Sequence, residues 1–264
     1  MSELTLAVFA SETGTHLVRP PRGQRWRAFE RRFDERAYLE RLAAGGHHFL
    51  ARSSPDFPPL LRAIHDPPTG LFLRGEGEPE LLARPAVAIV GARASSGYGA
   101  SVARSLGREL AAAGLVVVSG LARGIDAEAH RGALEADGTT VAVLGCGIDR
   151  DYPAAHAELA RRVADAGLIV SEYAPGVEPA PWRFPARNRI VAGLCAATGL
   201  QPNVVDKILA FLEKQTGKPY LVWQSEKPDK TPIYTLASRK PSDIWQWPVI
   251  SSAGDWFATA PVIN

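Results

Sequence analysis

Cysteine and methionine are scarce in this chain, and lysine is missing from most of it. Two cysteines, Cys146 and Cys195, and a single methionine occur among 264 residues. This number excludes a disulfide-dense secreted scaffold, and the wide separation of the two cysteines fits no metal-binding spacing. We therefore expect a cytoplasmic protein in a reducing compartment, with no metal site.

Long apolar runs are missing as well. No stretch approaches the roughly 20 consecutive apolar residues that span a bilayer, and residues 1–19 lack the basic start and apolar centre of a signal peptide. We therefore expect no membrane partner. The composition, 46% hydrophobic and 22% charged, excludes disorder of the whole chain and suits one large or two modest domains.

The distribution of lysine predicts a boundary near residue 200. Residues 1–206 contain no lysine and hold 23 Arg against 23 Asp plus Glu. Residues 207–264 hold six Lys and one Arg against five acids, so the net charge of +2 lies there. Four of the six tryptophans share this stretch: Trp223, Trp245, Trp247 and Trp256. Such a shift in composition indicates a join between two different sequence segments.

A strand–helix repeat occupies the middle of the chain. Apolar runs rich in β-branched residues lie at Val87–Val90, Leu115–Val118, Thr140–Leu144 and Leu168–Val170. Amphipathic segments separate them, at Tyr98–Ala113, Asp126–Ala136 and Ala154–Ala166. Repeats of about 25 residues with uniformly apolar strands are typical of right-handed βαβ units. The pattern predicts an α/β fold with a parallel sheet and helices on both faces.

The flanking segments are less regular. Arg25–Leu42 predicts one helix with alternating charge, and the five prolines of Ser53–Gly75 predict an extended connector with at most one short helix near Leu60–Ile64. In the tail we expect a helix over Val204–Glu213 and strands over Tyr220–Gln224 and Ile233–Leu236.

Small glycine-bearing turns follow the apolar runs. The first turn includes Gly91 and Arg93, the second Gly120 and Arg123, and the third begins at Gly145. Parallel strands end at one edge of a sheet, where glycine lets backbone N–H groups approach an anion and arginine offers a donor matched to phosphate. The set predicts a phosphate site. For any single turn, tight-turn geometry remains the alternative.

Missing motifs exclude some classes of anionic ligand. The first turn lacks the G-x-G-x-x-G pattern, the second strand ends in Ser119-Gly120 without the acidic residue that would hold a ribose, and no G-x-x-x-x-G-K-[ST] loop occurs. We therefore expect no dinucleotide or triphosphate cofactor. Pro181–Arg189 interleaves three arginines with Trp182, Phe184 and Asn188, which suits a nucleic-acid backbone with unstacked bases. An arginine-rich packing loop is the alternative.

Five phrases in this region resemble the DprA family, also called Smf, of DNA-processing proteins of natural transformation. They are VAIVGARASSGYG, VVSGLARGIDAEAHRGAL, VAVLGCGIDRDYP, LIVSEYAPG and FPARNRIVAGL, preceded by FPPLLRAIHDPPTGLFLRG. The resemblance covers residues 47–194. It implies an extended Rossmann-like fold in a non-catalytic protein that binds and protects single-stranded DNA and loads the recombinase RecA during DNA uptake and recombination.

The resemblance also implies a DNA-phosphate pocket. Carried over position by position, its residues are Gly91, Arg93, Ser96, Tyr98, Gly99, Ser119, Gly120, Arg123, Gly124, Asp126, Gly145, Gly147, Arg187, Asn188 and Arg189. We expect three parts: a short helical segment over residues 1–46, this core over 47–194, and an atypical α+β tail of unknown role over 195–264.

The chain departs from the family pattern at both ends. From the resemblance we expect a shortened N-terminal helical domain, because about 46 residues precede the core, and after Leu194 we expect none of the strand, helix and strand that would complete the sheet. That part of the family core contributes to self-association and RecA contact, so dimerisation and RecA binding are left open. A sheet that stops at the fourth run would expose an apolar edge. We expect the tail to cover that edge and the protein to be monomeric.

Two other functions stay open. A nucleotide-processing enzyme resembling phosphoribohydrolases could use the same superfamily fold, with Asp126, Glu128 and His130 as acid–base candidates, although the Pro-Gly-Gly-x-Gly-Thr turn of that class is missing. The chain could also be a truncated or hybrid product with a folded core and no activity.

Overall fold

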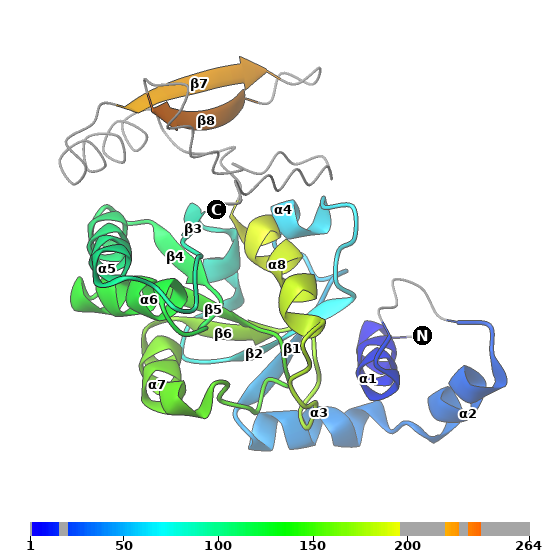
Figure 1. Ribbon diagram of the computed structural model, residues 1–264. Helices are drawn as coiled ribbons and strands as arrows, with labels where there is room; N and C mark the ends of the chain where they lie inside the picture. The colour runs from blue at the N-terminus through cyan, green and yellow to red at the C-terminus, as the bar shows by residue number, and fades with distance from the viewer. Residues whose placement is uncertain (1, 16–20, 196–219, 227–231, 239–264) are drawn as a thin grey trace.

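The computed structural model describes residues 2–15, 21–195, 220–226 and 232–238 (Figure 1). The helix expected over Val204–Glu213 lies outside these residues. In chain order the elements are α1 (Glu3–Thr13), α2 (Gln24–Arg32), α3 (Glu35–Ala44), β1 (His47–Ala51), α4 (Pro59–Arg62), β2 (Gly70–Arg74), the 3-10 helix η1 (Pro79–Ala83), β3 (Ala86–Ala88), α5 (Gly97–Ala112), β4 (Val116–Ser119), α6 (Ile125–Glu135), β5 (Thr140–Leu144), the 3-10 helix η2 (Ala154–His156), α7 (Ala157–Ala166), β6 (Leu168–Ser171), α8 (Arg183–Leu194), β7 (Tyr220–Glu226) and β8 (Pro232–Ser238).

A six-stranded sheet in the order β1-β2-β6-β5-β4-β3 forms the centre of the fold. Its four strands β3 to β6 are parallel, and in the middle of the sheet Val141 lies opposite Val118 on one side and Leu168 on the other. All four strands were predicted from the apolar runs, and the α/β class is confirmed. β4, β5 and β6 are buried along their whole length. Because both faces of these strands are covered, their residues are almost all apolar and do not alternate between apolar and polar.

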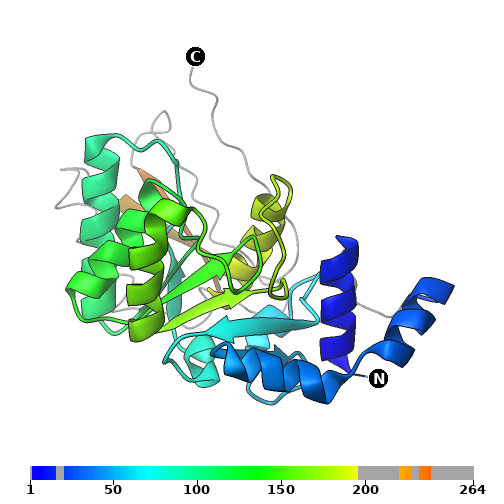
Figure 2. The ribbon, with the colours of Figure 1, turned by 90° about the horizontal axis from the view of Figure 1, so that it is seen from below.

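Helices cover both faces of the sheet, as expected (Figures 1 and 2). Each of β4, β5 and β6 is added on the same side of the strand before it, so right-handed crossovers place α5, α6 and α7 on one face. The other face is covered by α4, α8 and η1. Side-chain alternation follows: Val117 belongs to one buried cluster with Ala129 of α6, whereas Val118 belongs to another with Ile190 of α8.

The two antiparallel strands correct the predicted sheet edge. Within the stretch expected to be a connector, β2 forms and pairs with β6, placing Leu73 opposite Val170, and β1 pairs outside β2. The expectation of an exposed β6 edge is therefore wrong, as is the expectation of the tail covering it. The reason is that the last prolines of this stretch, Pro67 and Pro68, precede Gly70. The short apolar run that follows contains no proline and can therefore form strand hydrogen bonds. The expected short helix is present as α4.

The N-terminal segment also differs from its prediction. The single helix expected over Arg25–Leu42 is two helices, because Asp34 caps the second one by accepting a hydrogen bond from the Ala37 N–H at 3.0 Å. The chain therefore turns between α2 and α3. In the tail, the two expected strands are present as β7 and β8, which pair antiparallel with Tyr220 opposite Ser238 in a separate two-stranded sheet.

Candidate nucleic-acid interface

The first two glycine turns meet around a buried carboxylate. Asp126, at the start of α6, is 4% exposed. Its two oxygens accept hydrogen bonds from the Gly91 N–H at 3.3 Å and from the Gly120 N–H at 3.2 Å. A third link joins the Ile125 N–H to the Ala92 carbonyl at 3.2 Å. Asp126 therefore holds the turns after β3 and β4 side by side, as their position at one sheet edge predicts.

Arg187 connects the second turn to the end of β5, just before the third turn. Its guanidinium, 5% exposed, donates to the Gly120 carbonyl at 2.8 Å and to the Val143 carbonyl, and lies 3.8 Å from the Asp126 carboxylate. Burial raises the pKa of Asp126 and lowers that of Arg187, and in each case the opposite charge of the partner counters the shift. The pair is thus a structural support of the site.

Two glycines are required by close approach. A Cβ on Gly120 would overlap the Arg187 guanidinium, and one on Gly124 would overlap the Ala92 carbonyl oxygen. Gly124 also has φ +77, a backbone region that other residues adopt at a cost. These glycines therefore permit the packing of the turns against one another.

The outer surface of the same turns carries arginine side chains that have no acidic partner in the described part of the chain. Arg93 and Arg123 are exposed and, among the described residues, neither lies within ion-pair distance of a carboxylate. Nearby, Ser96 caps α5 by accepting from the Gly99 N–H at 3.1 Å, and Tyr98 is 64% exposed. A free guanidinium next to a helix N-terminus favours an anion such as phosphate.

Aromatic rings extend this surface. Phe184 stacks on Tyr152, with ring centroids 5.3 Å apart and an interplanar angle of 28°, and the Arg93 guanidinium lies 5.1 Å from the Phe184 centroid. Trp182 is 49% exposed and Tyr152 42% exposed. We name Arg93, Arg123, Tyr152, Trp182 and Phe184 the rim. Tyr152 was missed from the sequence, although an aromatic residue just after a strand-end glycine turn was the available signal.

The remaining predicted residues have structural contacts. The Ser119 hydroxyl donates to the Ile89 carbonyl at 2.6 Å, and the Gly147 N–H donates to the Val177 carbonyl at 2.8 Å. Arg189, midway along α8, pairs with Glu172. The predicted set therefore divides by exposure. Gly91, Arg93, Ser96, Tyr98, Arg123 and Asn188 are exposed, Gly99, Gly124 and Arg189 are half-buried, and Ser119, Gly120, Asp126, Gly145, Gly147 and Arg187 are buried. Contact of any of them with a ligand stays a prediction.

The acid–base candidates do not form a reactive group. His130 is completely buried, and its Nδ1 lies 2.7 Å from the Thr140 hydroxyl. Burial lowers the pKa of His130 to about 3. Glu128 instead pairs with Arg131 on the surface of α6. Across the described ranges, no three His, Cys, Asp or Glu residues lie close enough to hold a metal ion, and no helix is long and apolar enough to cross a membrane.

The four parallel strands, their glycine turns and the rim define a Rossmann-like protein with exposed arginines at the carboxyl ends of its strands. Comparison with known proteins narrows this class. A family model described as DNA recombination-mediator protein A matches residues 48–200, and the chain belongs to this family. The resemblance to DprA and Smf proteins drawn from the motifs is thereby confirmed.

Named relatives cover the same region. The chain is 40% identical to Protein Smf of Escherichia coli over 189 residues, covering 71% of this chain and 49% of the relative, and 46% identical to DNA processing protein DprA of Streptococcus pneumoniae over 143 residues, covering 53% and 48%. The chain thus spans about half the length of these curated relatives.

Solved structures agree with the fold. The crystal structure of DprA from Streptococcus pneumoniae matches with a TM-score of 0.59 and 31% identity, covering 82% of this chain and 78% of that one. DprA from Helicobacter pylori matches with a TM-score of 0.50 and 30% identity, covering 64% and 77%, and its structure was reported with that protein's single-stranded DNA binding mode.

Proposed function

We propose that this protein binds single-stranded DNA along the rim and acts in DNA processing and recombination. The observation that carries the proposal is the placement of two unpaired, exposed arginines, Arg93 and Arg123, on adjoining glycine turns beside exposed aromatic rings. The single-stranded DNA binding reported for the Helicobacter pylori relative supports it.

The chemistry of the rim accounts for a preference for single strands. Guanidinium groups bind phosphate oxygens of any sequence, and aromatic faces stack on bases that are not already stacked. In a duplex those bases are paired inside the helix, so Tyr152 and Trp182 would gain no stacking contact. The rim therefore favours an unpaired strand.

The wider biological role is proposed on the same basis. We infer a protein of the cytoplasm that is not an enzyme and that protects single-stranded DNA and loads RecA onto it. The complete burial of His130 supports a non-catalytic function, since it removes the imidazole of the acid–base candidates from any substrate. Whether the chain dimerises stays open.

A fluorescence-anisotropy titration tests the proposal. Oligothymidylate should bind more tightly than a duplex, and log affinity should fall linearly with log salt concentration. Arg93→Ala and Arg123→Ala should each weaken binding roughly tenfold, about 1.4 kcal/mol, and reduce the salt slope by about 0.7. The matched control is Arg84→Ala, an exposed arginine without an acidic partner in the described structure, just before β3 at the opposite edge of the sheet. Equal effects of the three substitutions would contradict the rim as the binding site.

A further inference from the structure

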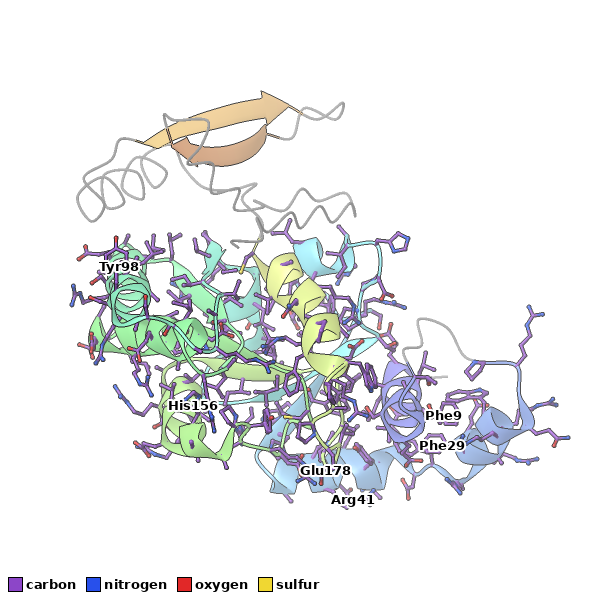
Figure 3. The ribbon with its side chains drawn as sticks, in the orientation of Figure 1. Phe9, Phe29, Arg41, Tyr98, His156 and Glu178 are labelled. Atoms are coloured by element: carbon purple, nitrogen blue, oxygen red, sulfur yellow. The ribbon has the colours of Figure 1, made fainter. Side chains whose placement is uncertain are left out.

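The helix α2 presents a dense arginine surface. Residues 22–32 contain five arginines and one acid, Glu30. Trp26 and Phe29 of this helix are buried and pack on Phe9 of α1, with ring centroids 5.1 and 5.2 Å apart (Figure 3). At about 100° per residue, Arg27 and Arg31 lie on the side of the helix opposite this buried pair, and Arg25 and Arg32 flank the pair. The α2 arginine face consists of Arg25, Arg27, Arg31 and Arg32, all exposed.

These arginines lack the acidic partners found elsewhere in the protein. Within the described structure, Arg25, Arg27 and Arg31 have no carboxylate within 4.0 Å, and Arg32 reaches Glu12 only at 4.0 Å with both side chains largely exposed. On α7, by contrast, Arg161 lies 2.7 Å from Asp165. Like charges one turn apart, as at Arg27 and Arg31, repel each other in a helix. An uncompensated cluster of this kind attracts a polyanion.

The rim and the α2 arginine face are connected through α1. Two views show α1 standing between α2 and the core (Figures 1 and 2). The end of α1 touches the loop that leads to α8, because the Ser11 hydroxyl accepts a hydrogen bond from the Ala174 N–H at 3.0 Å. Ala10 and Ser11 also line one cavity together with Tyr173 and Trp182. A strand leaving the rim at Trp182 would therefore pass over α1 and then over α2, each about 10 Å wide, to reach Arg27 and Arg31.

We propose that the α2 arginine face is a second phosphate-binding surface for the same single-stranded nucleic acid. It would engage only strands long enough to reach beyond the rim and across α1. The inference rests on the proposed function, because the rim must hold the strand first. The exposed guanidinium groups, with Ala28 as the one exposed apolar residue of α2, suit a phosphate backbone better than a folded protein surface.

The test compares two lengths of oligothymidylate: about 6 nucleotides, near the lower end of the roughly 4–16-nucleotide site sizes of single-strand-binding modules, and about 25 nucleotides, beyond their upper end. The variant is Arg27→Glu with Arg31→Glu. The matched control is Arg84→Glu with Arg162→Glu, which changes net charge equally at two exposed arginines that, in the described residues, also have no carboxylate within 4.0 Å. We expect the α2 variant to lower the affinity for the long strand at least tenfold and the affinity for the short strand less than twofold. The salt dependence of log affinity should become less steep for the long strand only.

Each other outcome is decisive. Unchanged binding of the long strand would overturn the proposal and would favour an acidic protein as the partner of the α2 arginine face. Equal weakening of both lengths, or equal effects of the control, would show a general field effect and also overturn it. If the unaltered protein binds neither length, the proposed function fails and this inference with it, whereas loss confined to the rim variants leaves the function intact and rejects only α2. Unchanged melting temperatures would show that each variant folds.

Discussion

The protonation state of His130 follows from its neighbours. Thr140 donates its hydroxyl proton to the Val117 carbonyl at 2.6 Å, so at 2.7 Å it can only accept from His130 Nδ1. The imidazole must then carry its proton on Nδ1 and leave Nε2 bare, and Nε2 is indeed buried without a hydrogen-bond partner in the described structure. The site fits the neutral ring and has no acceptor for a second proton.

This arrangement predicts acid sensitivity. Burial lowers the pKa of His130 from 6.5 to about 3, so below pH 6.5 the unfolded chain binds a proton that the folded chain does not. Stability from this group is complete above pH 6.5 and is lost as the pH falls toward 3. Between pH 7.5 and 5 we expect a loss of about 2 kcal/mol in the free energy of unfolding. Urea unfolding at several pH values would measure it.

The variant His130→Gln should remove this pH dependence, while His48→Gln, at an exposed histidine, should keep it. Parallel pH profiles for the unaltered protein and His130→Gln would mean that another group accounts for the acid sensitivity.

Residue types could be predicted for the site, but their exposure could not. The motifs pointed to Arg93 and Arg187 alike, since arginine at a strand-end turn or a helix start suits phosphate. The structure exposes Arg93 and encloses Arg187, because the orientation of α8 turns one face of the helix into the core. That orientation depends on packing between distant elements. No local pattern around Arg187 encodes it.

The strands were the most predictable elements, and β2 is an exception. Thr140–Leu144 was predicted with its observed bounds, because a strand buried on both faces needs an uninterrupted apolar run. β2 carries an equally apolar run, yet the prolines around it dominated the local pattern. Its partner is Leu168–Ser171, and pairing with so distant a segment leaves no trace in the sequence near β2.

The helices α5 and α6 touch through their backbones. A Cβ on Gly132 of α6 would overlap the Arg104 carbonyl oxygen of α5, and one on Gly107 of α5 would overlap the Ala129 carbonyl oxygen of α6. Glycine, normally a poor helix former, is thus required at this crossing. The approach fixes where α6 begins and with it the position of Asp126 under the first two turns.

Substitution at the crossing should therefore destabilise the protein. We expect Gly132→Ala to lower the free energy of unfolding by about 1–3 kcal/mol, since overpacking outweighs the gain of about 1 kcal/mol in helix propensity. The control Gly97→Ala places its methyl group where no atom lies within 4 Å and should be neutral or slightly stabilising. Denaturant titration measures both. A stability of Gly132→Ala equal to that of the control would show that the helices separate without cost.

At the scale of the whole molecule, the N-terminal helices share a core with the sheet. Leu6 and Phe9 of α1 belong to the same buried cluster as Phe72 of β2 and Ile169 of β6. The boundary expected at residue 46 stays a prediction, but the structure gives the two sides a common interior. Loss of the helices would uncover aromatic and aliphatic side chains on β1 and β2.

A chain that starts at His47 should therefore melt at a lower temperature and aggregate, as seen by calorimetry and light scattering. Uncovering Phe72, which is completely buried, removes about 1.5–3 kcal/mol of hydrophobic stabilisation by itself. Leu39→Ala tests the same segment at a residue that is 43% exposed, and it should leave the melting temperature unchanged. An unaltered melting temperature in the shortened chain would establish that the helices are an appendage.

The pairing of β2 with β6 has a consequence for synthesis. Phe72 pairs with Ser171, about 100 residues later in the chain, so β2 leaves the ribosome long before its partner exists. At roughly 5–20 residues per second, the nascent hairpin of β1 and β2 waits about 5–20 s with one edge unpaired. Such long-range closure is slow and exposes the chain to aggregation, which makes this interval the point at which a chaperone would act. The sheet closes only when β6 has emerged.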